Sequence, residues 1–376
     1  MSTALKLIRN VRLFSRDAEP CDLLFAGHQI AAVGGDLSVY GSLAEVFDAE
    51  GRVGVPGYFD QHVHVTGGGG EGGFIYKVPE ITLQSIIEGG VTSLVGLLGT
   101  DGISRSVENL VSKVYALREQ GISAWCLTGS YDFPSPTLTG SVEKDIAFID
   151  PVIGVKIAIN DHRGPQINRD ELIRLGAQAR VAGLISGKAG IVHLHTGRMP
   201  GGLSVLFDAV EGCDLPITVF RPTHLGNCFE DAIRFGKMGG YIDFTAGNAK
   251  KAALQLATAF EQVDATRITL SSDSNGSMPK WNDKKEMIGI GVGKISMLHD
   301  VVLELVNNFG FSIADAVRPI TENPAHALGM KKKGRLAEGY DADLVLYDDA
   351  LAIDAVFAKG CPMMWNKEVL IKDVFV

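Results

Sequence analysis

The sequence has little of what marks secreted, membrane or nucleic-acid-binding proteins. Its five cysteines are odd in number, scattered and never in C-x-x-C spacing, so we predict free buried thiols rather than a disulfide framework or a cysteine zinc site. No apolar run reaches the roughly 18 residues of a membrane-spanning helix, and residues 1–14 lack the apolar core of a signal peptide. We therefore expect a cytoplasmic protein.

Positive charge is also scarce. Lysine and arginine together number 35 against 44 acidic residues, which gives a formal net charge of −9. A nucleic-acid-binding surface needs a concentrated basic face, and none is visible. Because 46% of the residues are hydrophobic and 21% charged, the composition indicates a folded globular protein. We expect a small-molecule substrate, with no nucleic acid or membrane partner.

Both ends of the chain consist of short segments in which apolar and polar residues alternate. This pattern is typical of small antiparallel strands. The segments are 5–14, 22–25, 29–33 and 45–48 at the N-terminal end, and 342–347, 353–358 and 369–376 at the C-terminal end. We predict that residues 1–55 and 330–376 together form one small β-sandwich domain.

The middle of the chain, residues 56–329, alternates short β-like runs with amphipathic helices. A clear helix spans 107–117, with Gly121 placed to end it. The runs number eight, the number that closes a (β/α)8 TIM-type barrel. They are 58–64, 92–96, 123–128, 153–159, 191–195, 217–224, 241–245 and 268–273. The predicted fold is therefore an α/β barrel carrying the β-sandwich domain.

Chemically active side chains in such a barrel lie at the C-terminal ends of the strands. The first strand ends in His62 and His64, which share one face because side chains alternate along a strand. The other strand ends offer Lys156, the pair His193 and His195, His224, and Asp273. Spacing does not choose between His193 and His195, although His195 lies closer to the strand end and is favoured.

Each of these residues also has an ordinary structural interpretation. A single strand-end histidine is more often a core or rim residue, Lys156 could extend to solvent, and Asp273 could cap a following helix. Their joint occurrence on five strands favours a metal centre instead. A buried lysine with a lowered pKa can also react with carbon dioxide, and the resulting carbamate could bridge two metal ions.

These strand-end residues resemble the metal ligands of the amidohydrolase superfamily. Further motifs are Asp60-Gln61-His62-Val63-His64, Gly67-Gly68-Gly69-Gly70-Glu71, Gly96-Leu97-Leu98-Gly99-Thr100-Asp101, Leu127-Thr128-Gly129-Ser130-Tyr131, Thr139-Gly140-Ser141-Val142-Glu143-Lys144-Asp145, Ile159-Asn160-Asp161-His162-Arg163 and Ser271-Ser272-Asp273-Ser274-Asn275-Gly276-Ser277. With these motifs, the chain more narrowly resembles the isoaspartyl (β-aspartyl) dipeptidases over nearly its whole length.

The resemblance implies a metallohydrolase with two zinc ions (Zn²⁺) per chain. His62 and His64 would bind one ion, His195 and His224 the other, and a carboxylated Lys156 would bridge them together with a hydroxide. The hydroxide would attack the β-aspartyl amide bond. Asp273 would ligate metal and transfer the proton, and Tyr131 would stabilise the charged carbonyl oxygen.

Substrate-binding residues follow from the same resemblance. Glu71 would bind the free α-ammonium, while Gly69, Thr100 and Ser277 would lie near the aspartyl α-carboxylate and the leaving residue. Arg163 would bind the carboxylate of the leaving amino acid. All except Glu71 could equally be turn or capping residues. A phosphate loop at Gly67–Gly70 is excluded, because the G-x-x-x-x-G-K-[ST] spacing is absent.

One segment departs from the family. The run after His224, Leu225-Gly226-Asn227-Cys228-Phe229, lacks the arginine that gives relatives a second carboxylate ligand. Arg198 or Arg221 could compensate, although Arg221 should face away from the barrel axis. Residues 246–257 form an Ala/Lys-rich helix in place of a family loop. The preference for the leaving residue therefore stays open.

Two other functions are compatible with the sequence. An amidohydrolase acting on N-acyl amino acids or cyclic amides such as hydantoins would use the same metals, but Glu71 would then have no ammonium to bind. A non-catalytic scaffold without metals is the alternative from another class, and the intact ligand set argues against it. The family resemblance also implies a homo-oligomer.

Overall fold

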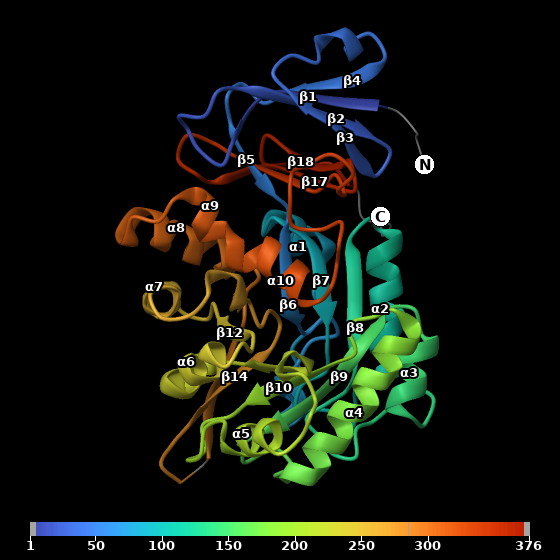
Figure 1. Ribbon diagram of the computed structural model, residues 1–376, viewed down its shortest axis with the longest axis vertical. Helices are drawn as coiled ribbons and strands as arrows, with labels where there is room; N and C mark the ends of the chain where they lie inside the picture. Colours follow the sequence, from blue (N-terminus) through green and yellow to red (C-terminus); the bar gives the residue numbers. More distant parts are fainter. Residues whose placement is uncertain (1–4, 285, 372–376) are drawn as a thin grey trace.

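The computed structural model describes residues 5–284 and 286–371, and parallel strands alternate with helices through the middle of the chain (Figure 1). Six of these strands form one parallel sheet in the order β11-β10-β9-β8-β7-β6. Their bounds are β6 (Tyr58–Val63), β7 (Val91–Gly96), β8 (Ser123–Gly129), β9 (Val152–Ile159), β10 (Ile191–Thr196) and β11 (Phe220–Thr223). Because the strands are parallel, their C-terminal ends lie at one edge.

A second parallel pair, β12 (Ile242–Thr245) and β13 (Ile268–Ser271), continues the arrangement. Strand β12 contacts β11. Beyond β13, Ser274 forms a parallel bridge with Val63, and its carbonyl accepts a hydrogen bond from His64 N at 2.9 Å. The chain thus has an α/β fold with a curled parallel sheet, and β6 lies beside both β7 and β13.

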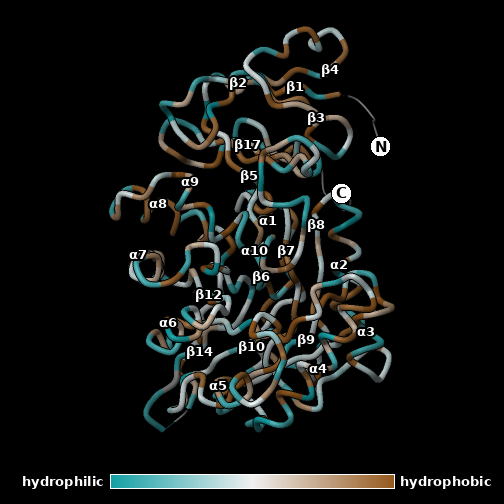
Figure 2. The backbone as a smooth tube through the Cα atoms, viewed as in Figure 1, coloured by the Kyte–Doolittle hydropathy of each residue, from teal (hydrophilic) through white to brown (hydrophobic). Residues whose placement is uncertain are grey.

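Helices cover the outside of the parallel strands, and apolar and polar residues alternate along them (Figures 1 and 2). The helices are α1 (Leu83–Glu88), α2 (Val107–Glu119), α3 (Val142–Phe148), α4 (Arg169–Ser186), α5 (Ser204–Glu211), α6 (Phe229–Lys237), α7 (Ala249–Phe260), α8 (Met297–Phe309), α9 (Ile313–Val317) and α10 (Glu322–Ala327). The residues that they bury are mostly apolar, as in α2 and α8. The predicted helix at 107–117 is confirmed as α2, which Ser106 caps and after which Gly121 adopts a φ of 101°. The helix predicted over 246–257 corresponds to α7.

The two ends of the chain share one nine-stranded sheet of order β19-β18-β17-β16-β5-β1-β2-β3, with β4 beside β1. Its strands are β1 (Leu5–Leu13), β2 (Cys21–Ala26), β3 (Gln29–Gly34), β4 (Ala44–Asp48), β5 (Val53–Pro56), β16 (Leu344–Tyr347), β17 (Ile353–Ala358), β18 (Cys361–Trp365) and β19 (Glu368–Val369). Of the strand predicted at 369–376, residues 372–376 lie outside the described residues.

The prediction of antiparallel strands throughout this sheet is wrong for β1, which pairs in parallel with both β4 and β5. Residues 35–43 return the chain from β3 to the start of β1, so β4 runs in the same direction as β1. Alternation of apolar and polar residues reports which face of a strand is buried. It does not report the direction of the neighbouring strand.

The sheet of the chain ends is apolar on both faces. On β16, Val345 and Tyr347 pack into the core shared with the α/β part, whereas Leu344 and Leu346 pack against β1 and β2. Tyr347 also contacts the hydroxyl of the buried Tyr58 at the start of β6. The parallel sheet is therefore anchored to the sheet of the chain ends at its N-terminal edge, opposite the strand ends that carry the predicted site.

The five cysteines are all unpaired. Cys126 is buried as expected, and Cys21, Cys213 and Cys228 are half-buried, but the expectation fails for Cys361, which is exposed at the start of β18. Among the helices of the described residues, none combines the length and the apolar character that crossing a membrane requires.

Candidate active site

The predicted site residues gather around a cavity of about 980 Å³ at the C-terminal ends of the parallel strands. Nine of the lining residues were predicted from the sequence: His64, Gly69, Thr100, Tyr131, Arg163, His195, His224, Asp273 and Ser277. His62 and Lys156 are fully buried beneath it, and Glu71 lies at its side through contacts with Thr100 and Ser277.

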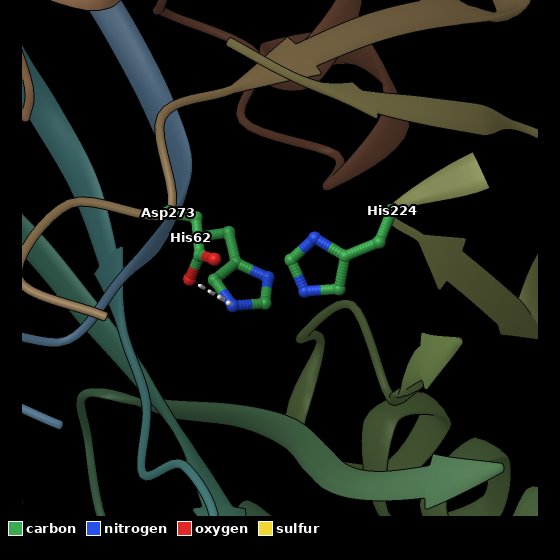
Figure 3. A group of neighbouring side chains, drawn as sticks. All are labelled: His62, His224 and Asp273. Carbon is green, nitrogen blue, oxygen red and sulfur yellow. Dashed lines mark ion pairs between the residues drawn. The ribbon is translucent and has the colours of Figure 1, made fainter. Parts of the chain in front are cut away.

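The centre of the site is a cluster of imidazoles and one carboxylate. His62 and His64 project from β6 and its end, and their Nε2 atoms lie 3.3 and 3.1 Å from Oδ1 of Asp273. His224 follows β11, and one ligand atom each of His62, His224 and Asp273 fall within 4.8 Å of one another. Figure 3 shows His62 and Asp273 paired, with the ring of His224 facing them.

Lys156 reaches this cluster from β9. Its Nζ lies 3.4 Å from His62 Nε2 and 6.0 Å from the centre of the Tyr131 ring. Neither contact supplies a negative charge, although a fully buried ammonium would require one. Burial accordingly lowers the pKa of Lys156 to about 7, so much of this amine is neutral at neutral pH.

The two histidines of β10 lie at different depths. His193 Nε2 is 2.8 Å from His62 Nδ1, so His193 supports His62 from below. His195 lines the cavity, where its Nδ1 lies 2.7 Å from the hydroxyl of Tyr131 and its Nε2 lies 2.8 Å from Asp161 Oδ2. The layering agrees with the choice of His195 as the histidine closer to the strand end, with His193 one layer deeper. The sequence did not indicate the contact between His193 and His62.

Three strand ends turn through residues with left-handed backbone. Asn160 after β9, His224 after β11 and Asp273 after β13 have φ values of 54°, 60° and 55°. Residues other than glycine rarely adopt this backbone conformation. At functional sites the conformation costs about 1–3 kcal/mol per residue. Contacts of the surrounding cluster offset this cost and aim His224 and Asp273 across the cavity.

Burial keeps the imidazoles of His62 and His195 neutral, and neighbouring histidines keep the carboxylate of Asp273 ionised. Burial, together with nearby Lys156, lowers the pKa of His62 well below its usual range, and burial lowers that of His195 to about 4. Burial raises the pKa of Asp273, but His224, His62 and His64 outweigh it and hold the value well below the usual range. Neutral imidazole nitrogens and an ionised carboxylate are the forms that bind divalent metal ions.

A second group of polar residues lies beside the cluster. Glu71 Oε1 accepts hydrogen bonds from Thr100 Oγ1 and Ser277 Oγ, both at 3.0 Å, and from Arg163 Nη1 at 2.9 Å. Arg163 is held in turn by both oxygens of Asp161. An acidic and a basic group therefore pair with each other at one side of the cavity.

Two of the glycines before Glu71 are required because their loop packs closely against residues 76–78. A Cβ on Gly67 would lie 2.0 Å from the carbonyl oxygen of Val78, and one on Gly69 would lie 2.4 Å from that of Tyr76. Both have positive φ values, 76° and 81°. Gly68 and Gly69 also line the cavity. Because glycine has no side chain, their backbone can approach a bound ligand closely.

The wall after β13 is a hairpin, β14 (Ser277–Trp281) and β15 (Met287–Val292), which the sequence did not reveal. Asp273 precedes this hairpin and does not cap a helix. Of the two arginines considered for the missing ligand, Arg198 lies on the exposed rim of the cavity. Arg221 lies elsewhere: its guanidinium stacks 4.2 Å from the centre of the Tyr241 ring and donates to the carbonyl of Ala327.

The donor set fits a divalent cation. Asp273 with His62 and His64 offers an oxygen and imidazole nitrogens, the mixture that zinc prefers, and His224 approaches the same point. In addition, Nδ1 of His64 is buried and has no hydrogen-bond partner among the described residues. A buried polar atom in this state is unusual and is consistent with a missing ligand.

Comparisons with known proteins agree with this fold and donor set. The family model described as "Amidohydrolase family" matches residues 237–376. The crystal structure of a β-aspartyl dipeptidase from Fervidobacterium islandicum AW-1 in complex with β-Asp-Leu dipeptide is 39% identical, with a TM-score of 0.93 over 98% of this chain and 100% of that one. A second structure of that enzyme is 37% identical over the same shares, with a TM-score of 0.90.

A more distant relative is adenine deaminase 3 of Rhizobium meliloti, which is 24% identical over 98% of this chain. The chain spans 59% of the length of that relative. The fold and the donor set thus define an amidohydrolase. At 39% identity over a whole dipeptidase chain, this protein belongs to the β-aspartyl dipeptidase family and is a hydrolytic enzyme, as the sequence motifs predicted.

Proposed function

We propose that the protein is a binuclear zinc hydrolase that cleaves the amide bond of β-aspartyl dipeptides. The observation that carries the proposal is that one cavity combines a cluster of metal donors with the pair formed by Glu71 and Arg163. A β-aspartyl dipeptide carries an ammonium and a carboxylate on opposite sides of its amide bond. A related enzyme was crystallised with such a dipeptide.

His62 and His64 would hold one zinc ion and His195 and His224 the other, with Asp273 also a ligand. Lys156, carboxylated through its neutral amine, would be a ligand of both ions, and its position beside His62 supports that role. When bound, the two ions supply a water of lowered pKa as the nucleophile and polarise the scissile carbonyl. The eight parallel strands that position these ligands are inferred to close into the predicted barrel.

The substrate's charges would replace those that Glu71 and Arg163 now supply to each other. Its α-ammonium would take the place of the Arg163 guanidinium against Glu71, whose Oε2 is buried without a partner among the described residues. The carboxylate of the leaving residue would take the place of Glu71 against Arg163, where the guanidinium fork suits it. Gly69, Thr100 and Ser277 would contact the aspartyl α-carboxylate.

Two residues of the chain handle charge and protons during cleavage. Burial raises the pKa of Tyr131 far above its usual range, so its hydroxyl stays protonated and can donate a hydrogen bond to the carbonyl oxygen as negative charge develops. The low pKa of Asp273 keeps its carboxylate ready to accept the proton of the attacking water. Asp273 then passes that proton to the leaving nitrogen.

A substrate panel tests the proposal. Zinc-loaded protein is assayed with β-aspartyl, γ-glutamyl and α-aspartyl dipeptides, N-acyl amino acids and hydantoin, with release of the free amino acid or opening of the ring as the readout. We expect kcat/KM to be highest for β-aspartyl dipeptides. Preferential hydrolysis of N-acyl amino acids or hydantoin would overturn the substrate assignment, and zinc content well below one ion per chain after reconstitution would overturn the metal assignment.

A further inference from the structure

Asp161 lies where the metal donors meet the residues proposed to bind the leaving carboxylate. It lies two residues after the end of β9, and its side chain is 5% exposed. Its Oδ2 lies 2.8 Å from His195 Nε2 and 2.7 Å from Arg163 Nη2, while Oδ1 accepts from Arg163 Nε at 2.9 Å. The backbone N–H of Arg163 also donates to Oδ1, at 2.9 Å. One carboxylate therefore joins two functional side chains.

These contacts define the tautomer of His195. Asp161 accepts three hydrogen bonds from Arg163, two of them from the guanidinium, so it is the ionised partner of an ion pair. An ionised carboxylate can only accept, so Nε2 of His195 must carry the hydrogen and Nδ1 must carry the lone pair. The hydroxyl of Tyr131, 2.7 Å from Nδ1, donates to that lone pair.

We propose that Asp161 is a positioning residue shared by the two halves of the site. It holds His195 with the Nδ1 lone pair available to zinc, and it fixes the guanidinium of Arg163 in the orientation that receives the leaving residue's carboxylate. The inference rests on the proposed function, because it takes His195 as a zinc ligand and Arg163 as a substrate ligand. It assigns Asp161 no contact with the substrate.

This arrangement also explains the contact between Tyr131 and His195. The tyrosine hydroxyl and a zinc ion would use the same lone pair on Nδ1, so they cannot occupy it together. In the zinc-loaded protein the hydroxyl of Tyr131 is therefore free to donate to the substrate carbonyl. A carboxylate that orients a metal-binding histidine through its other ring nitrogen typically raises metal affinity about 10- to 100-fold.

Zinc release is the first readout, because it requires no substrate. Asp161→Asn removes the negative charge and one of the two acceptor oxygens, so the side chain cannot keep all four hydrogen bonds from His195 and Arg163. We therefore expect zinc to pass to a chelating dye about 10- to 100-fold faster than from the wild type. Asp132→Asn is the matched control, since Asp132 lies on a neighbouring strand-end loop and interacts with Ser130 instead. Arg163→Met should release zinc at the wild-type rate.

Substrate kinetics provide the second readout. On β-Asp-Leu, zinc-saturated Asp161→Asn and Arg163→Met should both raise KM, by about tenfold or more, because each loses an aligned guanidinium. On β-aspartyl p-nitroanilide, which has no leaving carboxylate, neither Arg163→Met nor zinc-saturated Asp161→Asn should show this rise in KM. A rise in KM on β-Asp-Leu alone indicates that Arg163 is misaligned, whereas a rise on both substrates indicates general damage to the site.

Two results would overturn the inference: wild-type zinc release from Asp161→Asn, or equally fast release from Arg163→Met. If Asp161→Asn does not fold, a crystal structure of the zinc-loaded wild type decides. We expect zinc on Nδ1 of His195 with Asp161 bonded to Nε2, whereas zinc on Nε2 or on Asp161 itself would refute the proposal. If zinc release follows the expectation but no β-aspartyl dipeptide is cleaved, the substrate assignment alone fails.

Discussion

The reactivity of the Lys156 amine depends strongly on its buried surroundings. Burial outweighs the opposing effect of Asp273 and Asp243 and lowers the pKa of Lys156 to about 7, so the neutral amine is available to react with carbon dioxide. We predict that protein stripped of metal and kept free of carbon dioxide regains little activity with zinc alone, and regains it fully with zinc and bicarbonate. The measurement is activity together with zinc content after each addition.

Lys156→Met is the control for this experiment, since it keeps an apolar chain of similar length without the amine. It should bind zinc weakly and show no response to bicarbonate. Full recovery of the wild type with zinc in the absence of bicarbonate would show that the lysine acts without carboxylation.

Glu71 supports a second prediction at the same scale. Glu71→Gln preserves the shape of the side chain and removes the charge that the substrate's ammonium would meet. Hydrogen bonds to charged groups are worth about 1.5–3 kcal/mol, so kcat/KM on β-Asp-Leu should fall about 10- to 100-fold. Succinyl-leucine lacks the ammonium, and Glu71→Gln should cleave it as well as the wild type does. An equal loss on both substrates would argue against an ammonium site at Glu71.

Residue identity and spacing were enough to predict which side chains gather at the cavity. Several histidines and an aspartate at the ends of different strands indicate a shared metal site more readily than separate structural roles. Alternation along a strand placed His62 and His64 on one face. The roles of Asp161 and His193 could not be predicted in the same way. Asp161 contacts His195 and His193 contacts His62, in both cases across neighbouring strands. The residues at the strand ends do not reveal which side chains meet across strands.

At the scale of elements, alternation and helical periodicity predicted the parallel strands and α2. Two features escaped. The β14–β15 hairpin was missed because its strands are short and interrupted by glycine, proline and charged residues. The parallel pairing of β1 with β4 and β5 was missed because pairing direction depends on the path of the connecting segment. The division of the chain at residues 56 and 329 stays a prediction.

The loops after β9 and β10 support a prediction about how elements hold the site. Gly197 follows β10 and packs on the loop after β9, where an added Cβ would lie 2.3 Å from Asn160 O and 2.5 Å from Asp161 Cα. Both neighbours are backbone, so Gly197→Ala must push the Asp161 loop outward. We expect a loss of about 1–3 kcal/mol in the free energy of unfolding and at least a tenfold loss of kcat/KM.

Gly35→Ala is the control for this variant, because a Cβ at Gly35 meets nothing within 4 Å. It should leave both quantities near the wild-type values. Urea denaturation and kinetics on β-Asp-Leu provide the two measurements. If Gly197→Ala is destabilised and yet retains full kcat/KM, the two loops do not fix the position of Asp161.

At the scale of the whole molecule, Lys333 joins the parallel sheet to the sheet of the chain ends. Its Nζ lies 2.6 Å from Ser123 Oγ on β8, 2.6 Å from Asp343 Oδ2 just before β16, and 2.9 Å from Asp341 Oδ2. Burial lowers the pKa of Lys333, but Asp343 and Asp341 outweigh it, so the net pKa is raised. A buried ion pair therefore lies at the boundary between the parallel sheet and the sheet of the chain ends.

We predict that Lys333→Met lowers the free energy of unfolding by about 3 kcal/mol at pH 7, because it leaves a buried carboxylate without its cation. Since the folded-state pKa of Lys333 is raised, the ion pair stabilises the fold fully below the pKa of the unfolded lysine, about 10.4. That contribution is lost as pH rises above this value and through the folded-state pKa. The difference between wild type and variant should therefore be constant from pH 7 to about 9.5 and shrink above pH 10.5. Urea denaturation across this range measures it, with Lys333→Met/Asp343→Asn expected to regain part of the loss. A difference that stays constant at high pH would mean that Lys333 stabilises this boundary by packing rather than by its charge.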